Sequence, residues 1–360
     1  MPKSHAGRAT PRPRATLFSS LAVAAALCLL PLAAGAQARD REHGPWEPLL
    51  LRDQGSFFVG GETVSRGPGD DVTVGQMYVQ YQVPVSLRRR LPVVMLHGCC
   101  LTGKTYEDTP DGRMGWAEYF VRRGHPVYVP DQVGRGRSGF DATVHEQVRA
   151  GQRPVSDLPR INQASHQRAW QIFRFGPEYG QQFPGQQFPE EAFDELFQQM
   201  VPDLIAWLPA PNPTWARLAS LAERLEGAVL MGHSQSGFFP QRAALSAGAT
   251  DDIRGLVSLE PGSCAAAALT PEEYVKLAAI PTIIMFGDFV EEDTSGIWAN
   301  ALRDCRQYAD AINARGGDAT VVFLPDIGLR GNTHMFMQDR NSDEVADVLL
   351  RWIRDHVERR

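Results

Sequence analysis

The stretch AVLMGHSQSG, residues 228–237, constrains the fold more than any other part of the chain. An apolar run ends in Gly232, His233 and Ser234, and the FPQRAALSAG that follows has a helical pattern. A buried strand that turns at once into a helix holds the serine at a tight, strained turn, where it can act as a nucleophile. Residues two places before and after the serine must then be small, as Gly232 and Ser236 are, although glycine is more common at the second place. A serine that falls in such a turn by chance is the alternative.

Short apolar runs alternate with helical segments through most of the chain. The expected strands after residue 90 are 91–98, 126–131, 228–232, 255–260, 282–288 and 320–326. Continuous apolar runs of this length are typical of strands that are buried on both faces of a parallel sheet. Helical patterns at 116–124 and 342–357 lie around them, and 56–64 with 72–84 predict a strand pair at the start. We therefore expect an α/β fold, with a mostly parallel, twisted sheet and helices on both faces.

One segment, residues 140–200, interrupts this alternation. It has no convincing strand, contains the tandem repeat GQQFPGQQFP and carries eight aromatic residues between positions 170 and 197. The apolar spacing from Phe193 to Leu208 predicts an amphipathic helix. Aromatic residues in an insertion suggest a cap over a site, although ordinary packing or a subunit interface would use the same residues. We expect 140–200 to be a cap inserted between core segments 37–139 and 201–360.

The first 36 residues have the pattern of a secretory signal peptide. A basic start without acidic residues precedes an apolar run from Leu17 to Ala34, and AGAQA offers cleavage after Ala36 or Ala38. A retained membrane anchor is the alternative, but the run is rich in alanine, is broken by Pro31 and ends in a cleavage pattern. No later stretch is long and apolar enough to span a bilayer. We expect a secreted or periplasmic protein.

Charge and cysteine content limit the partners of the mature chain. Removal of residues 1–36 takes away four positive charges, so the formal net charge falls from −6 to −10. So acidic a protein is a poor candidate for binding nucleic acid or anionic membranes. Four cysteines then remain, Cys99, Cys100, Cys264 and Cys305, and export favours disulfides among them. The absence of a CxxC pair argues against a metal site.

A serine nucleophile needs a general base and a carboxylate that orients the base. In α/β-hydrolases the nucleophile, the acid and the histidine follow in this order along the chain. His334 lies in a loop between the last expected strand and the last helix, where this order requires the base. Glu260 and Asp288 each end a strand between Ser234 and His334. The usual position of the acid, after the later strand, favours Asp288 slightly.

The same chemistry needs donors for the oxyanion that forms on the attacked carbonyl. One donor is the backbone N–H of the residue after the nucleophile, here Gln235, and the other comes from the loop after the strand that ends in His97 and Gly98. The sequence of that loop is CC, so we expect the N–H of Cys99 to be the second donor.

With these residues in these positions, the chain resembles the secreted bacterial esterases of the α/β-hydrolase fold, whose structurally described member comes from Alcaligenes. The matching blocks are HGCCLTGKTYEDTPDGRMGWAEYF, DQVGRGRSG, GHSQSG, LEPGSC, FGDFVEE and GNTHMFMQDRN, spread over residues 97–341. The cysteine pair with TPDGRMGW is highly specific, whereas residues 140–200 are not matched.

The resemblance implies assignments that the residues alone leave open. It implies that Glu260 is the acid of a Ser234–His334–Glu260 triad, with Asp288 as a supporting residue or alternative acid. It implies a vicinal Cys99–Cys100 disulfide at the oxyanion hole, a second disulfide between Cys264 and Cys305, and a homodimer. A disulfide between neighbouring residues is strained, since adjacent Cα atoms lie about 3.8 Å apart and disulfides usually span about 4.4–6.8 Å. Two reduced, space-filling cysteines are the alternative.

The expected function is that of a secreted serine carboxylesterase that needs no metal or organic cofactor and acts on a small-molecule ester. An amidase, a lactonase or a thioesterase would use the same triad, and a non-catalytic binding module could use the same scaffold.

Overall fold

Eight strands form one sheet in the part of the chain that the computed structural model describes, residues 48–87, 91–204, 208–246, 248–249, 251–293 and 295–359. The expected signal peptide lies outside these residues. The strands are β1 (Leu51–Gly67), β2 (Asp70–Pro84), β3 (Val93–Leu96), β4 (Val127–Pro130), β5 (Ala228–His233), β6 (Ile253–Leu259), β7 (Thr282–Phe286) and β8 (Ala319–Phe323). Their order is β1-β2-β4-β3-β5-β6-β7-β8. Both pairings of β2 are antiparallel and the others are parallel, which confirms the predicted mostly parallel sheet.

Helices cover both faces of this sheet, because alternate residues of each buried strand point to opposite sides. Val93 and Met95 face a core with α2 (Trp116–Arg122) and α10 (Ser342–Trp352). Val94 and Leu96 face the other core, whose helices are α6 (Pro213–Arg224), α7 (Phe239–Ala244), α8 (Pro271–Ala278) and α9 (Ile297–Asn313). This arrangement brings the loops after β3, β5, β6 and β7 to the same edge of the sheet.

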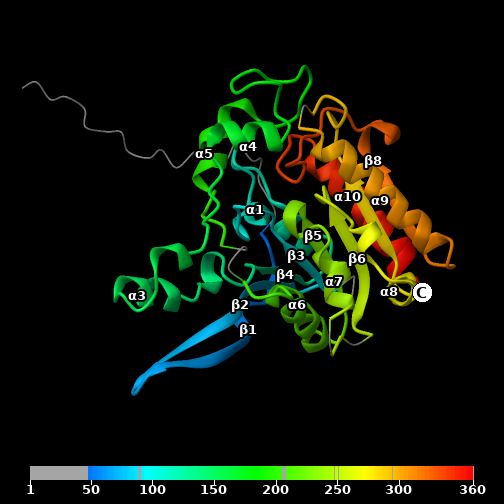
Figure 1. The fold of residues 1–360 in the computed structure, drawn as a ribbon. Helices are drawn as coiled ribbons and strands as arrows, with labels where there is room; N and C mark the ends of the chain where they lie inside the picture. The colour runs from blue at the N-terminus through cyan, green and yellow to red at the C-terminus, as the bar shows by residue number, and fades with distance from the viewer. Residues whose placement is uncertain are drawn as a thin grey trace, which may run out of the picture. The chain divides into compact units, whose positions relative to one another are not determined.

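The segment 140–200 has helices but no strand, as expected. Its helices are α3 (Thr143–Arg149), α4 (His166–Ile172) and α5 (Phe193–Gln198), and Figure 1 shows α4 beside α5, well apart from α3. Aromatic packing joins α4 to α5, since the ring centroids of Trp170 in α4 and Phe193 in α5 lie 4.5 Å apart.

The helix predicted from Phe193 to Leu208 is wrong over residues 199–204, since α5 ends at Gln198, and residues 205–207 lie outside the described part of the chain. Pro202 has no backbone N–H and forces the residue before it away from helical geometry, so the chain leaves the helix before this proline. Asp203 then pairs with Asn162 through two backbone hydrogen bonds, of 2.7 and 2.9 Å.

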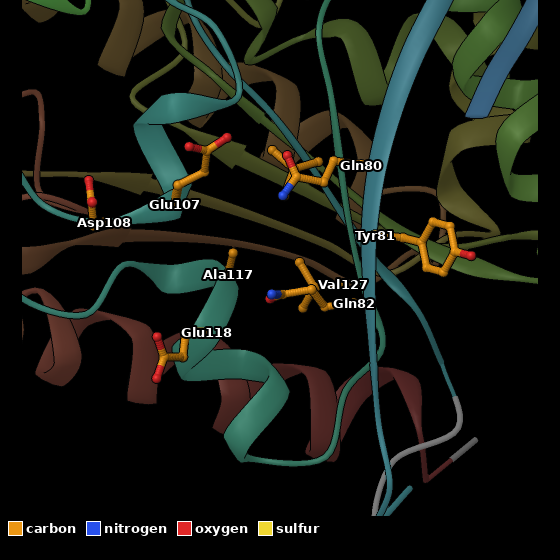
Figure 2. Close-up of a pocket in the computed structure, with 9 residues that line it drawn as sticks. Gln80, Tyr81, Gln82, Glu107, Asp108, Ala117, Glu118 and Val127 are labelled. Carbon is orange, nitrogen blue, oxygen red and sulfur yellow. The ribbon is translucent and has the colours of Figure 1, made fainter. Parts of the chain in front are cut away.

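A polar pocket with a volume of about 220 Å³ lies beside β2, away from the expected site. Figure 2 shows its acidic lining residues Glu107, Asp108 and Glu118 on one side and residues of β2 on the other. Two of these carboxylates already form ion pairs with a residue four positions away: Asp108, directly after α1 (Lys104–Glu107), with Lys104, and Glu118 with Arg122 in α2.

Among the described helices, none is long and apolar enough to cross a membrane.

Candidate active site

Ser234 lies at the tight turn between β5 and α7. Its backbone has a φ of 57°, in the left-handed region that non-glycine residues rarely adopt. The turn is so tight that a Cβ on Gly232 would lie 2.0 Å from the Ser236 carbonyl oxygen, which explains why the sequence needs glycine there. Ser236, which stands where glycine is more common, has a role of its own. It accepts a hydrogen bond from the His233 N–H and donates one of 2.8 Å to the His97 carbonyl.

His334 is buried, and its two ring nitrogens have different surroundings. Nδ1 lies 3.1 Å from Glu260 Oε2, and because a carboxylate only accepts, Nδ1 carries the proton. Nε2 has no hydrogen-bond partner among the described residues. Burial lowers the pKa of His334 and outweighs the opposing effect of Glu260, so the ring is neutral with its free lone pair on Nε2. This is the protonation state that a general base requires.

His233, the residue before Ser234, contacts His334 and so holds the two loops next to each other. The His233 ring, next to Ser234, packs 4.6 Å from the His334 ring, and its Nε2 lies 2.9 Å from the His334 carbonyl oxygen. Between the described atoms there is no hydrogen bond from Ser234 to His334 Nε2. Catalytic hydrogen bonds are often loose in ligand-free proteins and tighten around the substrate.

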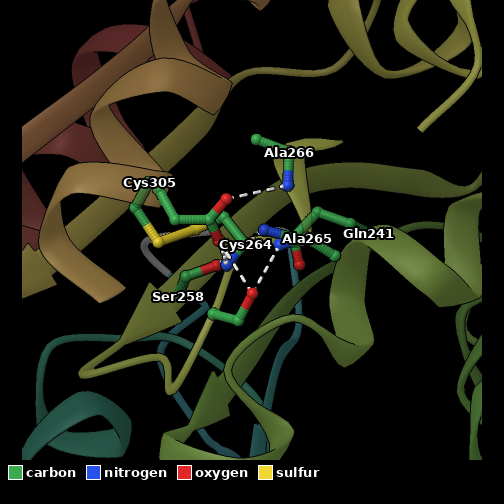
Figure 3. Close-up of a disulfide and its surroundings, with 8 residues drawn as sticks. Gln241, Ser258, Cys264, Ala265, Ala266 and Cys305 are labelled. Carbon is green, nitrogen blue, oxygen red and sulfur yellow. Dashed lines mark hydrogen bonds between the residues drawn. A yellow bond between two sulfur atoms is a disulfide. The ribbon is translucent and has the colours of Figure 1, made fainter. Parts of the chain in front are cut away.

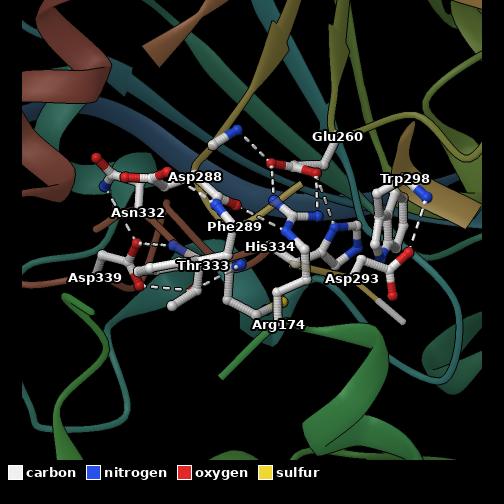
Figure 4. A network of polar contacts seen from close by, with 12 residues as sticks. Arg174, Glu260, Asp288, Phe289, Asp293, Trp298, Asn332, Thr333, His334 and Asp339 are labelled. Atoms are coloured by element: carbon white, nitrogen blue, oxygen red, sulfur yellow. Dashed lines mark hydrogen bonds and ion pairs between the residues drawn. The ribbon is translucent and has the colours of Figure 1, made fainter. Parts of the chain in front are cut away.

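Glu260 is the carboxylate that contacts His334. It directly follows β6, has a φ of 48° and is completely buried. Burial alone would raise its pKa, but the Arg174 guanidinium and the His334 ring lower it to about 2. Arg174 donates to both carboxylate oxygens, at 2.8 and 2.6 Å, and Gly287 N–H donates to Oε1 (Figure 4).

Asp288 faces away from His334. Its carboxylate accepts hydrogen bonds of 2.9 Å from the backbone N–H groups of Phe289 and Gly331. Its own backbone N–H and carbonyl bind the Asn332 carbonyl, at 2.7 Å, and Arg174 Nε, at 2.9 Å. Asp288 therefore braces the loop that leads to His334, and the slight preference for Asp288 from strand order does not match this geometry.

The two expected oxyanion donors lie on adjoining loops. Gly98 lets these loops meet, since a Cβ there would lie 2.8 Å from Ser234 Cβ. Among the described residues, neither the Cys99 N–H nor the Gln235 N–H has a hydrogen-bond acceptor. Both donors are thus free for a substrate oxygen.

Sequence reasoning missed the ion pair that joins these loops. Arg135 donates to the Leu101 carbonyl, at 3.2 Å, and pairs with buried Asp203, while Asp203 accepts a 2.7 Å hydrogen bond from the Gln235 side chain. Arg135 lies in the DQVGRGRSG block that carried the resemblance, but the spacing of that block gave no sign of its role. Asp203 lay in a stretch predicted to be helical.

The cysteine pair contacts Asn162 of the segment 140–200 and Val201 directly after it. The Cys99 and Cys100 sulfur atoms are 2.7 Å apart and the structure contains them as free cysteines, so the vicinal disulfide stays a prediction. Cys100 has a φ of 61°, and its carbonyl accepts a 2.8 Å hydrogen bond from Val201 N–H. In the described part of the chain, Cys99, Cys100 and Asp203 form one group that could ligate a metal, with ligand atoms within 4.8 Å. Asp203 already holds Arg135 and Gln235, which any metal would have to displace.

The other two cysteines form the disulfide that the resemblance implied. Cys264, four residues after Glu260, is bonded to Cys305 in α9 (Figure 3). Asp304, next to Cys305, accepts hydrogen bonds from the Cys264 and Ala266 N–H groups, at 2.7 and 3.1 Å. The loop that follows Glu260 is therefore fastened to α9 by a covalent bond and by a carboxylate.

The segment 140–200 supplies further residues that sequence reasoning missed. The Phe173 carbonyl accepts a 3.0 Å hydrogen bond from the His334 N–H, and the Phe173 ring stacks on His334 at 5.4 Å. Gln187, from the tandem repeat, donates 2.8 Å to the Gly331 carbonyl. The Trp298 ring of α9 also packs against His334, with 4.2 Å between the ring centroids. The only sequence signal for these contacts was the concentration of aromatic residues.

Comparisons with known proteins give two informative matches, and no protein-family model matches the chain. One solved structure, that of a novel bacterial esterase at atomic resolution, is 48% identical and has a TM-score of 0.80. The match covers 86% of this chain and 98% of the other chain. A curated relative, the probable secreted lipase phiG of Fungal sp. (strain ATCC 74256), is 26% identical over 362 residues, or 85% of this chain and 95% of the relative.

Proposed function

The chain belongs to the family of bacterial esterases with the α/β-hydrolase fold and is a carboxylic ester hydrolase, and on this premise we propose that it works through a Ser234–His334–Glu260 triad and an acyl-enzyme. His334 Nε2 takes the proton of Ser234 Oγ as this oxygen attacks the ester carbonyl. The N–H groups of Cys99 and Gln235 stabilise the oxyanion. His334 then gives its proton to the leaving alcohol and activates a water molecule that releases the acid.

One observation carries this proposal, namely the state of the His334 ring. Nδ1 donates to ionised Glu260 at 3.1 Å while Nε2 is free of partners among the described residues. A buried imidazole with a fixed tautomer and a free lone pair next to a strained serine is suited to remove the proton of that serine.

Labelling with a serine-directed phosphonate tests the nucleophile. We expect one phosphonyl group per active chain, on the peptide that contains Ser234, and no labelling of Ser234→Ala. We also expect Ser234→Ala to lose roughly 10⁵-fold or more in kcat, because the triad acts as a unit. Ester turnover that survives in Ser234→Ala would disprove the proposal.

Amides, lactones and thioesters are attacked by the same groups, so the bond that this enzyme prefers is a matter for direct assay. A panel of matched esters, amides, lactones and thioesters with one acyl group would rank the leaving groups by kcat/KM. We expect esters to rank first, in agreement with the relatives. An amide or thioester ranked above the ester would replace the carboxylesterase proposal with that activity.

The segment 140–200 is proposed to be the cap that shapes the ester pocket. Its contacts with the cysteine loop, with His334 and with Glu260 support this role. We further propose that the protein is exported, which the N-terminal pattern, the Cys264–Cys305 disulfide and the secreted relative support. A homodimer is proposed from the resemblance alone, and light scattering of the purified protein at several concentrations would test it.

A further inference from the structure

Arg174 is a cation of the inserted segment that lies inside the proposed triad. It follows α4, has a φ of 55° and keeps only 1% of its surface exposed. Its guanidinium forms two hydrogen bonds to Glu260 and one to the Asp288 carbonyl. The side chain packs over the Trp298 ring, with 5.2 Å between the guanidinium carbon and the ring centroid. Figure 4 shows the guanidinium and the His334 ring next to each other on the Glu260 carboxylate.

The geometry of this pair is that of a clamp. A guanidinium that donates two parallel hydrogen bonds fixes the plane of a carboxylate as well as its distance. Glu260 Oε2 is shared, since it accepts 2.8 Å from Arg174 Nη1 and 3.1 Å from His334 Nδ1. Because Arg174 fixes the carboxylate plane, it also fixes the direction of the hydrogen bond between Glu260 Oε2 and His334 Nδ1.

The Arg174–Glu260 pair joins the inserted segment to the core of the fold. Glu260 directly follows a central strand, whereas Arg174 belongs to a segment that the parallel sheet does not require. A buried carboxylate without a cation would be costly to keep charged. The core alone therefore does not complete the site.

We propose that Arg174 is a positioning residue of the ester hydrolase, which holds the Glu260 carboxylate against His334 and so makes triad assembly depend on the docked 140–200 segment. This inference rests on the proposed function, because it assumes that Glu260 is the acid of the triad.

The proposal predicts a change in pH dependence, because few other charges face these groups. His233, at the end of β5, is buried, and burial and His334 lower its pKa well below the usual range, so it is neutral. The Asp288 carboxylate is turned to backbone N–H groups, and that of Asp339 to Thr333 and Asn332. Of the described cations, Arg174 is the one in contact with Glu260, and its charge lowers the pKa of His334.

The test compares Arg174→Gln and Arg174→Lys with Arg168→Gln, which replaces an exposed arginine of the preceding helix α4, as the control. For Arg174→Gln we expect kcat per phosphonate-titrated site to fall roughly 10- to 100-fold. We also expect the acid limb of kcat/KM to move to higher pH, because loss of a neighbouring cation favours protonated His334. Arg174→Lys keeps the charge but not the fork, so kcat should fall while the acid limb stays in place.

A double-mutant cycle separates positioning from packing. If Arg174 acts through Glu260, Arg174→Gln should add little to Glu260→Gln, far less than the sum of the two losses. Wild-type kcat per titrated site in both Arg174 variants, or additive losses in the cycle, would overturn the inference. If Arg174→Gln does not fold, Arg174→Lys carries the same test alone. Activity that survives in Glu260→Gln would instead overturn the proposed triad, and with it the role of Arg174.

Discussion

At the scale of single residues, the carboxylate that contacts His334 is Glu260 and not Asp288, which strand order slightly favours as the acid. Both Glu260 and Asp288 follow strands at the same edge of the sheet, so the sequence could not distinguish them without the resemblance. In the structure Glu260 contacts His334 while Asp288 holds the N–H groups of Phe289 and Gly331. The deciding feature is the direction of a side chain at a strained turn, which no spacing rule predicts.

We expect Glu260→Gln to lose roughly 10³-fold or more in kcat, because an amide holds the His334 tautomer poorly and leaves Arg174 without its counter-ion. Asp288→Asn keeps one acceptor for the loop N–H groups and should lose less than about tenfold. Steady-state kinetics on both variants, with folding checked by circular dichroism, measure the difference. The assignment fails if only Asp288→Asn is inactive as a folded protein.

Glu260 should also make the free energy of unfolding depend on pH. Its pKa is about 2 in the folded protein and 4.5 for the unperturbed side chain, so the folded state binds fewer protons between these values. The stabilisation is therefore full above about pH 4.5 and is lost as the pH falls towards 2, with a size of about 3 kcal/mol. Urea unfolding at several pH values should show the stability gap between wild type and Glu260→Gln narrowing as the solution becomes acidic. A gap that does not change with pH would contradict this.

At the scale of elements, strands and the strand–turn–helix unit were predictable because local pattern determines them. The buried runs at 228–232 and 282–288 became β5 and β7, within two residues at their ends. The inserted segment was less predictable, since its structure depends on contacts distant in sequence, such as Asn162 with Asp203. The start of α10 shows the same limit. Asn341, which precedes the helix, has a residue type that commonly caps helices, but its side chain bonds Asn332 in the His334 loop instead.

The disulfide in the loop after Glu260 should act on stability. It encloses 41 residues, so the double variant Cys264→Ala/Cys305→Ala should lose about 4 kcal/mol of unfolding free energy by the chain-entropy estimate. Denaturant unfolding measures this loss directly. Unchanged stability would mean that the Asp304 hydrogen bonds alone fasten the loop.

In contrast, replacing the vicinal cysteines should lower kcat more than it lowers stability. A bond between neighbouring residues closes almost no loop and contributes little entropy, so Cys99→Ala/Cys100→Ala should melt close to wild type. If the predicted disulfide rigidifies the oxyanion donors, kcat should fall roughly tenfold or more. Mass spectrometry of the alkylated wild-type protein establishes first whether the bond is present. Unchanged kcat after its verified reduction would remove it from catalysis.

At the scale of the whole molecule, the order of elements was the most predictable property. Alternating strands and helices fix a parallel sheet with two covered faces, and this places the loops after β5 and β6 together. The long β1–β2 hairpin was predicted as a pair, but its length was underestimated, because most of β1 is exposed and lacks an apolar pattern. How 140–200 docks was not predictable, because its contacts use single side chains and backbone atoms from several loops.

The proposed export predicts at which residue the mature chain begins. Expression with residues 1–36 intact in a bacterium that secretes proteins should yield a protein that begins at Gln37 or Arg39, because the small-residue pattern allows both cleavage sites. Intact mass and N-terminal peptide mapping of the extracellular or periplasmic fraction measure this. A full-length protein retained in the membrane fraction would favour the anchor instead.

Beside its side-chain contacts, the segment 140–200 also contacts the neighbouring loops through main-chain atoms. Phe173 binds His334 and Gln187 binds Gly331, and Val201, directly after the segment, binds Cys100, each by a backbone hydrogen bond. Such bonds survive replacement of most side chains, so, on the proposal that this segment shapes the ester pocket, its lining residues could vary while His334 stays in place. The same proposals imply, in evolutionary terms, that new substrates could be acquired by point substitution in the segment, provided that Arg174 is kept.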